Sequence, residues 1–150
     1  MIERRELMLW LAAFPVLSLL VFSPVANGAP RDAKQRLKLL IGEKKPAKGR
    51  IKIELPAVTD QGRFVPIKVS VDSPMSDEDY VKAIHIIAER NPSPEVASFY
   101  LSPANGRAEI STRIRLLKTQ VVLVAAEMND GSTYLAKGRS KITGGAGGCG

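Results

Sequence analysis

The chain has very few of the residues that usually carry protein chemistry. Its 150 residues include one cysteine, one histidine and one tryptophan. A single cysteine cannot form a disulfide within the chain, and a histidine without further ligands nearby is a poor metal site. The histidine, His85, lies between Ile84 and Ile86, and we expect a satisfied or surface imidazole there rather than a ligand or base. The sequence therefore predicts no cofactor and no metal.

Aromatic residues are also scarce, at 5% of the sequence, although the net charge is +7. Binding to nucleic acid favours a basic patch with stacking aromatics or a recognisable module, and neither is present. We therefore expect no nucleic-acid partner, and a positive surface that steers small anions or acidic partners. With 45% apolar and 25% charged residues, the composition is typical of one globular domain.

The first 28 residues have the composition of an export signal. Arg4 and Arg5 precede an apolar run over 7–25 that two prolines interrupt, and small residues follow. We expect cleavage after Gly28, export to the periplasm and no stable membrane anchor. The arginine pair is similar to a twin-arginine signal, and an ordinary secretory signal is the alternative.

Residues 29–48 are expected to form an amphipathic helix and a linker. Apolar residues such as Ala33, Leu37 and Ile41 recur at helical spacing, while basic residues take the other face. The helix should end near Gly42, because the polar residues that follow include both proline and glycine.

From residue 49 the apolar residues alternate with polar ones, which predicts strands. The expected strands are 51–55, 65–71, 80–89, 96–101, 108–117, 121–128 and 133–142. About seven short strands with turn signals between them are typical of an all-β, immunoglobulin-like antiparallel sandwich, which we expect over 49–143. Pro66 indicates an edge or a bulge, and Asp130-Gly131 predicts a type I′ hairpin turn.

The chain ends in Gly144-Gly145-Ala146-Gly147-Gly148-Cys149-Gly150. Glycine samples both signs of φ, so we expect a flexible arm that carries the only thiol. From Thr143 to Cys149 this arm extends to about 20 Å. Such a tail does not hold a catalytic nucleophile rigidly, but its reach suits a carrier whose thiol enters the pockets of other enzymes.

Several charged groups outside the arm have an ordinary surface interpretation. Lys137, Arg139 and Lys141 lie just before the arm, and we expect a solvated strand face rather than a specific anion site. The acidic turn at 77–79 is interpreted as a solvated loop rather than a calcium site. Arg113 and Arg115 share one face of a predicted strand, and they either pair with a partner subunit or stay in water.

The terminal Gly-Gly-Cys-Gly and several internal stretches together resemble the SoxY family of sulfur carriers over nearly all of the predicted mature chain. The internal stretches are Val65-Pro66-Ile67, Asn91-Pro92-Ser93-Pro94-Glu95-Val96-Ala97-Ser98-Phe99, Ser111-Thr112-Arg113-Ile114-Arg115-Leu116 and Asp130-Gly131-Ser132. Their order and spacing are similar to those of the family. One departure is visible, because the family arm commonly ends in two glycines after the cysteine and here only Gly150 follows.

The resemblance implies a periplasmic sulfur carrier in thiosulfate oxidation that is not itself an enzyme. It implies covalent attachment of sulfur at Cys149, first as a cysteine S-thiosulfonate formed by a haem-containing SoxXA-like enzyme. A SoxB-like hydrolase then removes sulfate, and in some organisms a SoxCD-like dehydrogenase oxidises the remaining sulfane sulfur. A SoxZ-like subunit is implied as the partner in a heterodimer.

Two alternatives remain open. The first is an immunoglobulin-like periplasmic binding or assembly module with an inert tail. The second is a homodimer joined by an intermolecular disulfide at Cys149, which is also a plausible off-cycle state of a carrier.

Overall fold

The structure is a computed structural model that describes residues 30–144, so the predicted export signal and the last six residues lie outside it. The described part contains one α-helix, one short 3-10 helix and eight strands. In chain order they are α1 (Pro30–Ile41), β1 (Ile51–Glu54), β2 (Val58–Thr59), β3 (Val65–Val71), β4 (Val81–Ala88), β5 (Glu95–Tyr100), η1 (Pro103–Asn105), β6 (Glu109–Ile114), β7 (Gln120–Met128) and β8 (Thr133–Ile142).

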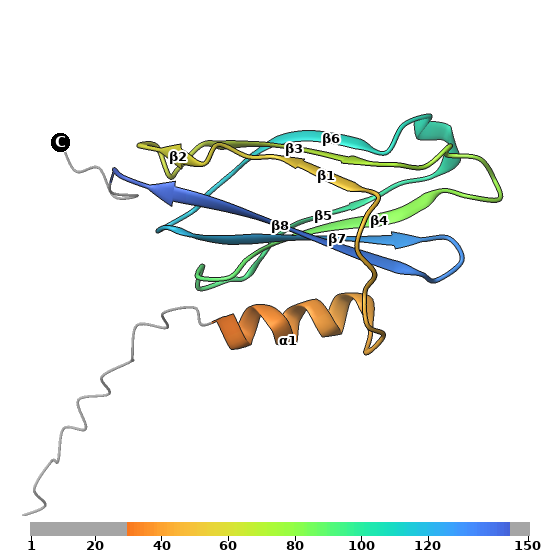
Figure 1. Cartoon of the computed structure of the whole chain (residues 1–150), viewed down its shortest axis with the longest axis horizontal. Helices are drawn as coiled ribbons and strands as arrows, with labels where there is room; N and C mark the ends of the chain where they lie inside the picture. The colour runs from red at the N-terminus through yellow and green to blue at the C-terminus, as the bar shows by residue number, and fades with distance from the viewer. Residues whose placement is uncertain (1–29, 145–150) are drawn as a thin grey trace, which may run out of the picture.

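The strands form two sheets that face each other, with α1 against the far side of the larger one (Figure 1). The three-stranded sheet has the order β1-β3-β6, and the five-stranded sheet has the order β2-β8-β7-β4-β5. Neighbouring strands are antiparallel except β2 and β8, which are parallel. The prediction of an immunoglobulin-like sandwich is confirmed at this level.

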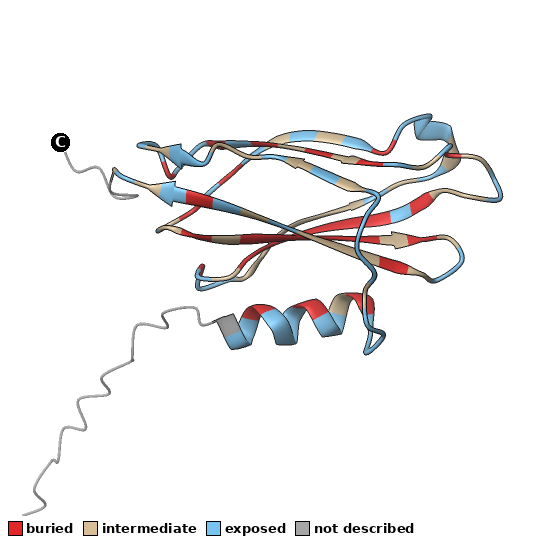
Figure 2. Ribbon diagram, viewed as in Figure 1, coloured by how far each residue is buried: buried red, intermediate tan, exposed pale blue. Residues whose placement is uncertain are grey.

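The main core fills the space between the two sheets, where alternate residues of each strand meet (Figure 2). Ile67 and Val69 of β3 face Ile84 and Ile86 of β4 across this layer, and all four are buried. The fully buried residues of this layer are mostly branched aliphatic side chains, which pack well on a pleated surface, and the aromatic residues Tyr80, Phe99 and Tyr134 pack around them. This layer fixes the relative position of the sheets.

A second, smaller core lies between α1 and the outer face of the five-stranded sheet. The helix buries Ala33, Leu37 and Ile41, which lie on one side of it at helical spacing. The sheet residues beneath them are Ile87, Leu123 and Ala125. The predicted amphipathic helix is confirmed, and it ends at Ile41 because Gly42 adopts a φ of 78°, which favours glycine.

Two details of the strand prediction were wrong. The short strand β2 was not predicted, and its parallel pairing with β8 departs from a purely antiparallel sandwich. The turn between β7 and β8 is not type I′, because only Gly131 has a positive φ (81°) and Asp130 does not. Instead, Gly131 N donates to Met128 O, and the Asp130 carboxylate accepts bonds from the backbone and hydroxyl of Ser132. These bonds lower the pKa of Asp130.

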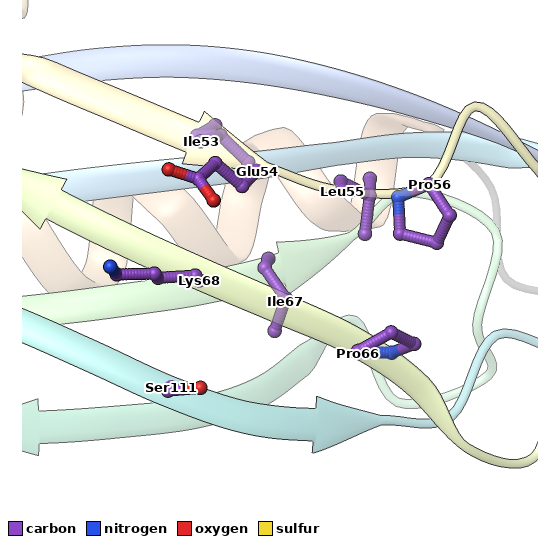
Figure 3. Close-up of a pocket in the computed structure, with 8 residues that line it drawn as sticks. All are labelled: Ile53, Glu54, Leu55, Pro56, Pro66, Ile67, Lys68 and Ser111. Atoms are coloured by element: carbon purple, nitrogen blue, oxygen red, sulfur yellow. The ribbon is translucent and has the colours of Figure 1, made fainter.

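Pro66 lies on the middle strand of the three-stranded sheet, at a point where one side of that strand is open. The pairing of β1 with β3 ends at Glu54 opposite Lys68, whereas β3 continues through Pro66 paired only with β6. The edge predicted from Pro66 is therefore present locally. The divergence of β1 leaves an open pocket of about 450 Å³, lined by residues of β1, β3 and β6 and by Leu55-Pro56 (Figure 3).

Candidate functional site

Strand β8 leads directly to the predicted arm, and β2 covers its outer edge. Lys141 N donates to Ala57 O (2.8 Å), and Thr143 N donates to Thr59 O (2.9 Å). The hydroxyl of Thr143 also donates to Thr59 O at 3.3 Å. A strand of two residues thus extends the sheet to the base of the arm.

The other edge of β8 is held near the same end of the strand by β7 and by Thr119, the residue before β7. Thr119 Oγ1 accepts a bond from Ile142 N (3.0 Å) and donates to Ile142 O (3.4 Å). The buried hydroxyl of Ser140 donates to Pro56 O at 2.8 Å. Hydrogen bonds on both edges therefore hold the end of β8 in place.

Gly144, the first residue of the predicted arm, lies against the backbone of Asp60. A Cβ at Gly144 would stand 2.1 Å from Asp60 O, and this distance is far shorter than any normal contact. Glycine is therefore required here for close packing. The sequence analysis explained this glycine by flexibility alone, and the steric reason was missed because Asp60 is remote in sequence.

The rest of the predicted arm, including Gly145, Ala146, Gly147, Gly148, Gly150 and the candidate attachment residue Cys149, lies outside the described residues. Its starting point is nevertheless fixed at Gly144. From there the five residues to Cys149 extend to about 16–18 Å. This distance bounds how far the thiol can lie from the end of the sandwich.

The three basic residues of β8 before the arm, Lys137, Arg139 and Lys141, are exposed on the outer face of the five-stranded sheet, as expected. The described residues also include a pocket of about 180 Å³ next to Arg139. This pocket could not be predicted from the sequence, because its walls come from three separate parts of the chain.

His85 is buried on the outer face of β4 and is satisfied, as predicted. Its Nδ1 lies 2.8 Å from Ser98 Oγ, and its Nε2 lies 2.9 Å from Glu127 Oε1. Ser98 Oγ donates to Glu95 Oε1 (2.7 Å), and Arg36 of α1 donates to the other oxygen of Glu95. The bond from Ser98 and then that from Arg36 lower the pKa of Glu95. This network fastens α1 to the sheet.

The remaining charged residues that the sequence singled out lie at the surface. Asp79 pairs with Arg50 at 3.2 Å, while the two preceding acidic residues are exposed. Arg113 is exposed on β6, and Glu109 of the same strand face lies 3.9 Å from Lys68.

Among residues 30–144, no group of three or more His, Cys, Asp or Glu side chains is arranged to hold a metal ion. No helix in this range is long and apolar enough to cross a membrane.

The fold and the end of β8 define a class of protein: an immunoglobulin-like sandwich whose last strand is held firmly and continues into a glycine-rich terminus. The family model described as sulfur oxidation protein SoxY matches residues 8–149. The chain belongs to the SoxY family, so the resemblance drawn from its motifs is confirmed. No curated protein matches the sequence.

One solved structure of the same family and one of another protein are similar to this chain. The sulfur carrier protein SoxY from Chlorobium limicola f thiosulfatophilum is similar, with 28% identity and a TM-score of 0.64, covering 77% of this chain and 99% of that one. A superoxide reductase (neelaredoxin) from Ignicoccus hospitalis has a TM-score of 0.55 at 18% identity, covering 63% of this chain and 80% of that one. The second likeness shows the fold alone.

Proposed function

We propose that this protein carries sulfur covalently on the thiol of Cys149 during thiosulfate oxidation and presents it to partner enzymes. The observation that carries the proposal is the extent of the family match, which runs to residue 149 and so includes the arm cysteine. The similar structure from Chlorobium is named as a sulfur carrier. The protein supplies the attachment point, and the partners supply catalysis.

The proposed cycle starts when a haem-containing SoxXA-like enzyme joins thiosulfate to Cys149. A sulfur–sulfur bond forms between the cysteine thiolate and the outer sulfur of thiosulfate, and two electrons leave to the partner. The product is Cys149–S–S–SO₃⁻. A SoxB-like hydrolase then adds water, which releases sulfate and a proton and leaves Cys149–S–SH. A SoxCD-like dehydrogenase, where present, oxidises the remaining sulfane sulfur with water as the oxygen source.

The described domain supports this division of labour through the way it holds the base of the arm. Hydrogen bonds from β2 and Thr119 fasten β8, and Gly144 packs on Asp60. The movement needed to enter partner sites is therefore assigned to residues 145–150, whose glycines allow it. The proposal includes export to the periplasm and a heterodimer with a SoxZ-like subunit.

The test is intact-mass analysis of the purified protein after incubation with thiosulfate and its oxidising partners. The expected result is a thiosulfonate adduct that fragmentation places on Cys149. The Cys149→Ser variant is the control and should remain unmodified with an unchanged fold. If wild-type protein stays unmodified while the partners oxidise another carrier, the proposal is wrong and an inert tail becomes the better interpretation.

A mass equal to two chains under non-reducing conditions would indicate the intermolecular disulfide instead. The two outcomes are separable, because a disulfide dimer disappears on reduction without releasing a sulfur oxyanion. A dimer that forms in place of the adduct would contradict the carrier role.

A further inference from the structure

Two hollows meet beside the C-terminal end of α1, at the edge of the five-stranded sheet. After the helix the chain runs along β8 (Figure 1), where Ala47 N donates to Thr133 O (2.8 Å) and Leu135 N donates to Ala47 O (3.0 Å). One hollow, of about 560 Å³, lies between this segment and β8, and the other, of about 270 Å³, lies between it and α1. Both are lined by Lys45, Pro46 and Leu135, so they form one groove, which we call the helix-end groove.

The floor of the helix-end groove is apolar. Leu37 and Ile41 of α1 line it and are buried, and Leu135 of β8 packs against the core to which they belong. Leu135 and Pro46 are half-buried, and Ala47 is exposed beside them. An apolar side chain that enters the groove is therefore removed from water on both sides, which favours binding.

The rim of the groove is basic. Six lysines line it, and all of them are exposed: Lys34, Lys38, Lys44, Lys45, Lys48 and Lys137. The lining contains one acidic residue, Glu43, which lies 4.0 Å from Lys38. Among residues 30–144 the other five lysines form no ion pair. Six lysines against one glutamate leave five excess positive charges, and a positive surface of this kind attracts acidic partners.

We propose that the helix-end groove docks a short acidic segment of a partner protein, and that apolar side chains of this segment occupy the two hollows. The apolar floor favours apolar side chains and the lysine rim favours carboxylates, so a segment that carries both matches the whole groove. The concave shape suits protruding side chains better than the flat surface of a membrane. An acidic peptide is therefore preferred to an anionic lipid surface.

The position of the groove separates it from the proposed carrier site. Leu135 lies near the start of β8 and Thr143 follows its end, so the two residues are roughly 26 Å apart along the strand at about 3.3 Å per residue. A segment held in the groove therefore leaves the end of β8 uncovered. The inference goes beyond the proposed carrier function and does not depend on Cys149.

The first experiment selects binders from a random peptide display library on the purified protein. The expected result is a set of peptides that combine acidic and apolar residues. Backbone amide NMR then maps one selected peptide, and the largest shift changes should fall on Lys45, Ala47, Leu135 and Lys137. A selection without binders, binders without acidic residues, or shift changes that cluster elsewhere would overturn the proposal.

The second experiment measures the affinity of the selected peptide for matched variants by fluorescence anisotropy. Lys45→Gln and Lys137→Gln should each weaken binding about two- to fivefold, the range expected for exposed ion pairs. Lys118→Gln removes the same charge from an exposed lysine outside the groove and should change the affinity little. Equal losses in Lys137→Gln and Lys118→Gln would overturn the proposal, because net charge alone would then explain the binding.

A third variant tests the floor of the groove. Ala47→Asp places a carboxylate there and should weaken binding about tenfold or more through like-charge repulsion, whereas Ala104→Asp, in η1, should not. Ala47 bonds to β8 through its backbone, so the fold should persist, and an unchanged urea midpoint confirms this. If the midpoint falls, the lysine variants decide the question.

Vesicles that contain phosphatidylglycerol test the membrane alternative. If they bind with the same dependence on Lys45 and Lys137 and no peptide does, the groove is a membrane-contact surface and the proposal is wrong. Cys149→Ser should bind the selected peptide as the wild type does. Loss of the sulfur adduct would therefore leave the groove unaffected, and loss of peptide binding would leave the carrier function unaffected.

Discussion

The outer faces of the two sheets differ, although both sheets share one core. On the three-stranded sheet, Lys68, Glu109 and Arg113 face water. On the five-stranded sheet, Ile87 and Leu123 are buried beneath α1. The sheet that carries the arm is therefore packed on both faces, whereas its partner is packed on one. The cover that α1 provides does not extend to the end of β8, where Arg139 and Lys141 are exposed.

The largest effect should come from Ile86→Ala, on the inner strand β4 of the five-stranded sheet. Ile86 is fully buried between the sheets, so the lost contacts and the cavity should lower the free energy of unfolding by about 2–5 kcal/mol. Urea unfolding measures this change. The matched variant Ile110→Ala, on the three-stranded sheet, should cost about half as much because its side chain is only half-buried. Equal losses of unfolding free energy in the two variants would contradict the expected difference between the two sheets.

The next effect should come from Gly144→Ala, at the edge of the five-stranded sheet. The added methyl would meet Asp60 O, and relief of this overlap should cost about 1–3 kcal/mol of local stability. Hydrogen exchange should show faster exchange of the Thr143 amide while the core amides keep their protection. Gly106→Ala is the control, because its φ of 71° is strained but its surroundings are open. Unchanged exchange at Thr143 would refute the close packing.

A smaller effect should follow from Ser98→Ala, which removes the Ser98 bond to Glu95, the residue that pairs with Arg36 of α1. The lost hydrogen bonds should cost about 0.5–1.5 kcal/mol. Because folding lowers the pKa of Glu95 from its ordinary value of 4.5, the Glu95 carboxylate stabilises the fold above that pH. This contribution disappears as the pH falls through the lower pKa of the folded protein.

The pH dependence of the free energy of unfolding separates two effects of Ser98. One is the stability that its hydrogen bonds contribute, and the other is its lowering of the Glu95 pKa. Below about pH 4.5 the free energy of unfolding should fall less steeply in Ser98→Ala than in wild type, because the carboxylate has lost its main partner. Urea unfolding over a pH series measures both slopes. Glu95→Gln, which removes the titrating group, should give the shallowest slope. An unchanged slope in Ser98→Ala would show that the bond to Ser98 is not what lowers the pKa.

The smallest effect should come from Lys68→Ala on the outer face of the three-stranded sheet. The Lys68–Glu109 pair is 3.9 Å apart and both side chains are 44% exposed, so its loss should cost less than about 0.5 kcal/mol. A double-mutant cycle with Glu109→Ala measures the coupling. A coupling above about 1 kcal/mol would mean that this face is more ordered than an exposed sheet surface.

Most of the fold could be predicted from the sequence because its strongest signals are local. Alternating apolar residues identified the seven longer strands, and helical spacing with Gly42 placed the end of α1. The short strand β2 gave no such signal, because two residues show no period and parallel pairing depends on a distant strand. The turn type at Asp130 was wrong because the Asp–Gly pair was taken alone, without the bonds that Ser132 makes.

The attachment site at Cys149 stays a prediction, because it lies outside the described residues, and the contacts that hold the base of the arm could not be predicted. A single cysteine on a glycine-rich terminus pointed to Cys149 directly. Thr119 and Asp60 could not be found in this way, because each meets the end of β8 from a distant part of the chain. The pocket of about 180 Å³ next to Arg139 is hidden for the same reason, since Arg90 and Arg139 come together only when β4, β7 and β8 pair.

The bonding of β8 on both edges has a mechanical consequence. A partner that grips the arm and withdraws along the strand direction loads the hydrogen bonds of β2 and of β7 together, in shear. A pull across the sheet would instead open these bonds one after another, starting at Thr143. The sandwich is thus strongest against tension along the line of its last strand, the direction in which a departing enzyme would draw on the tail.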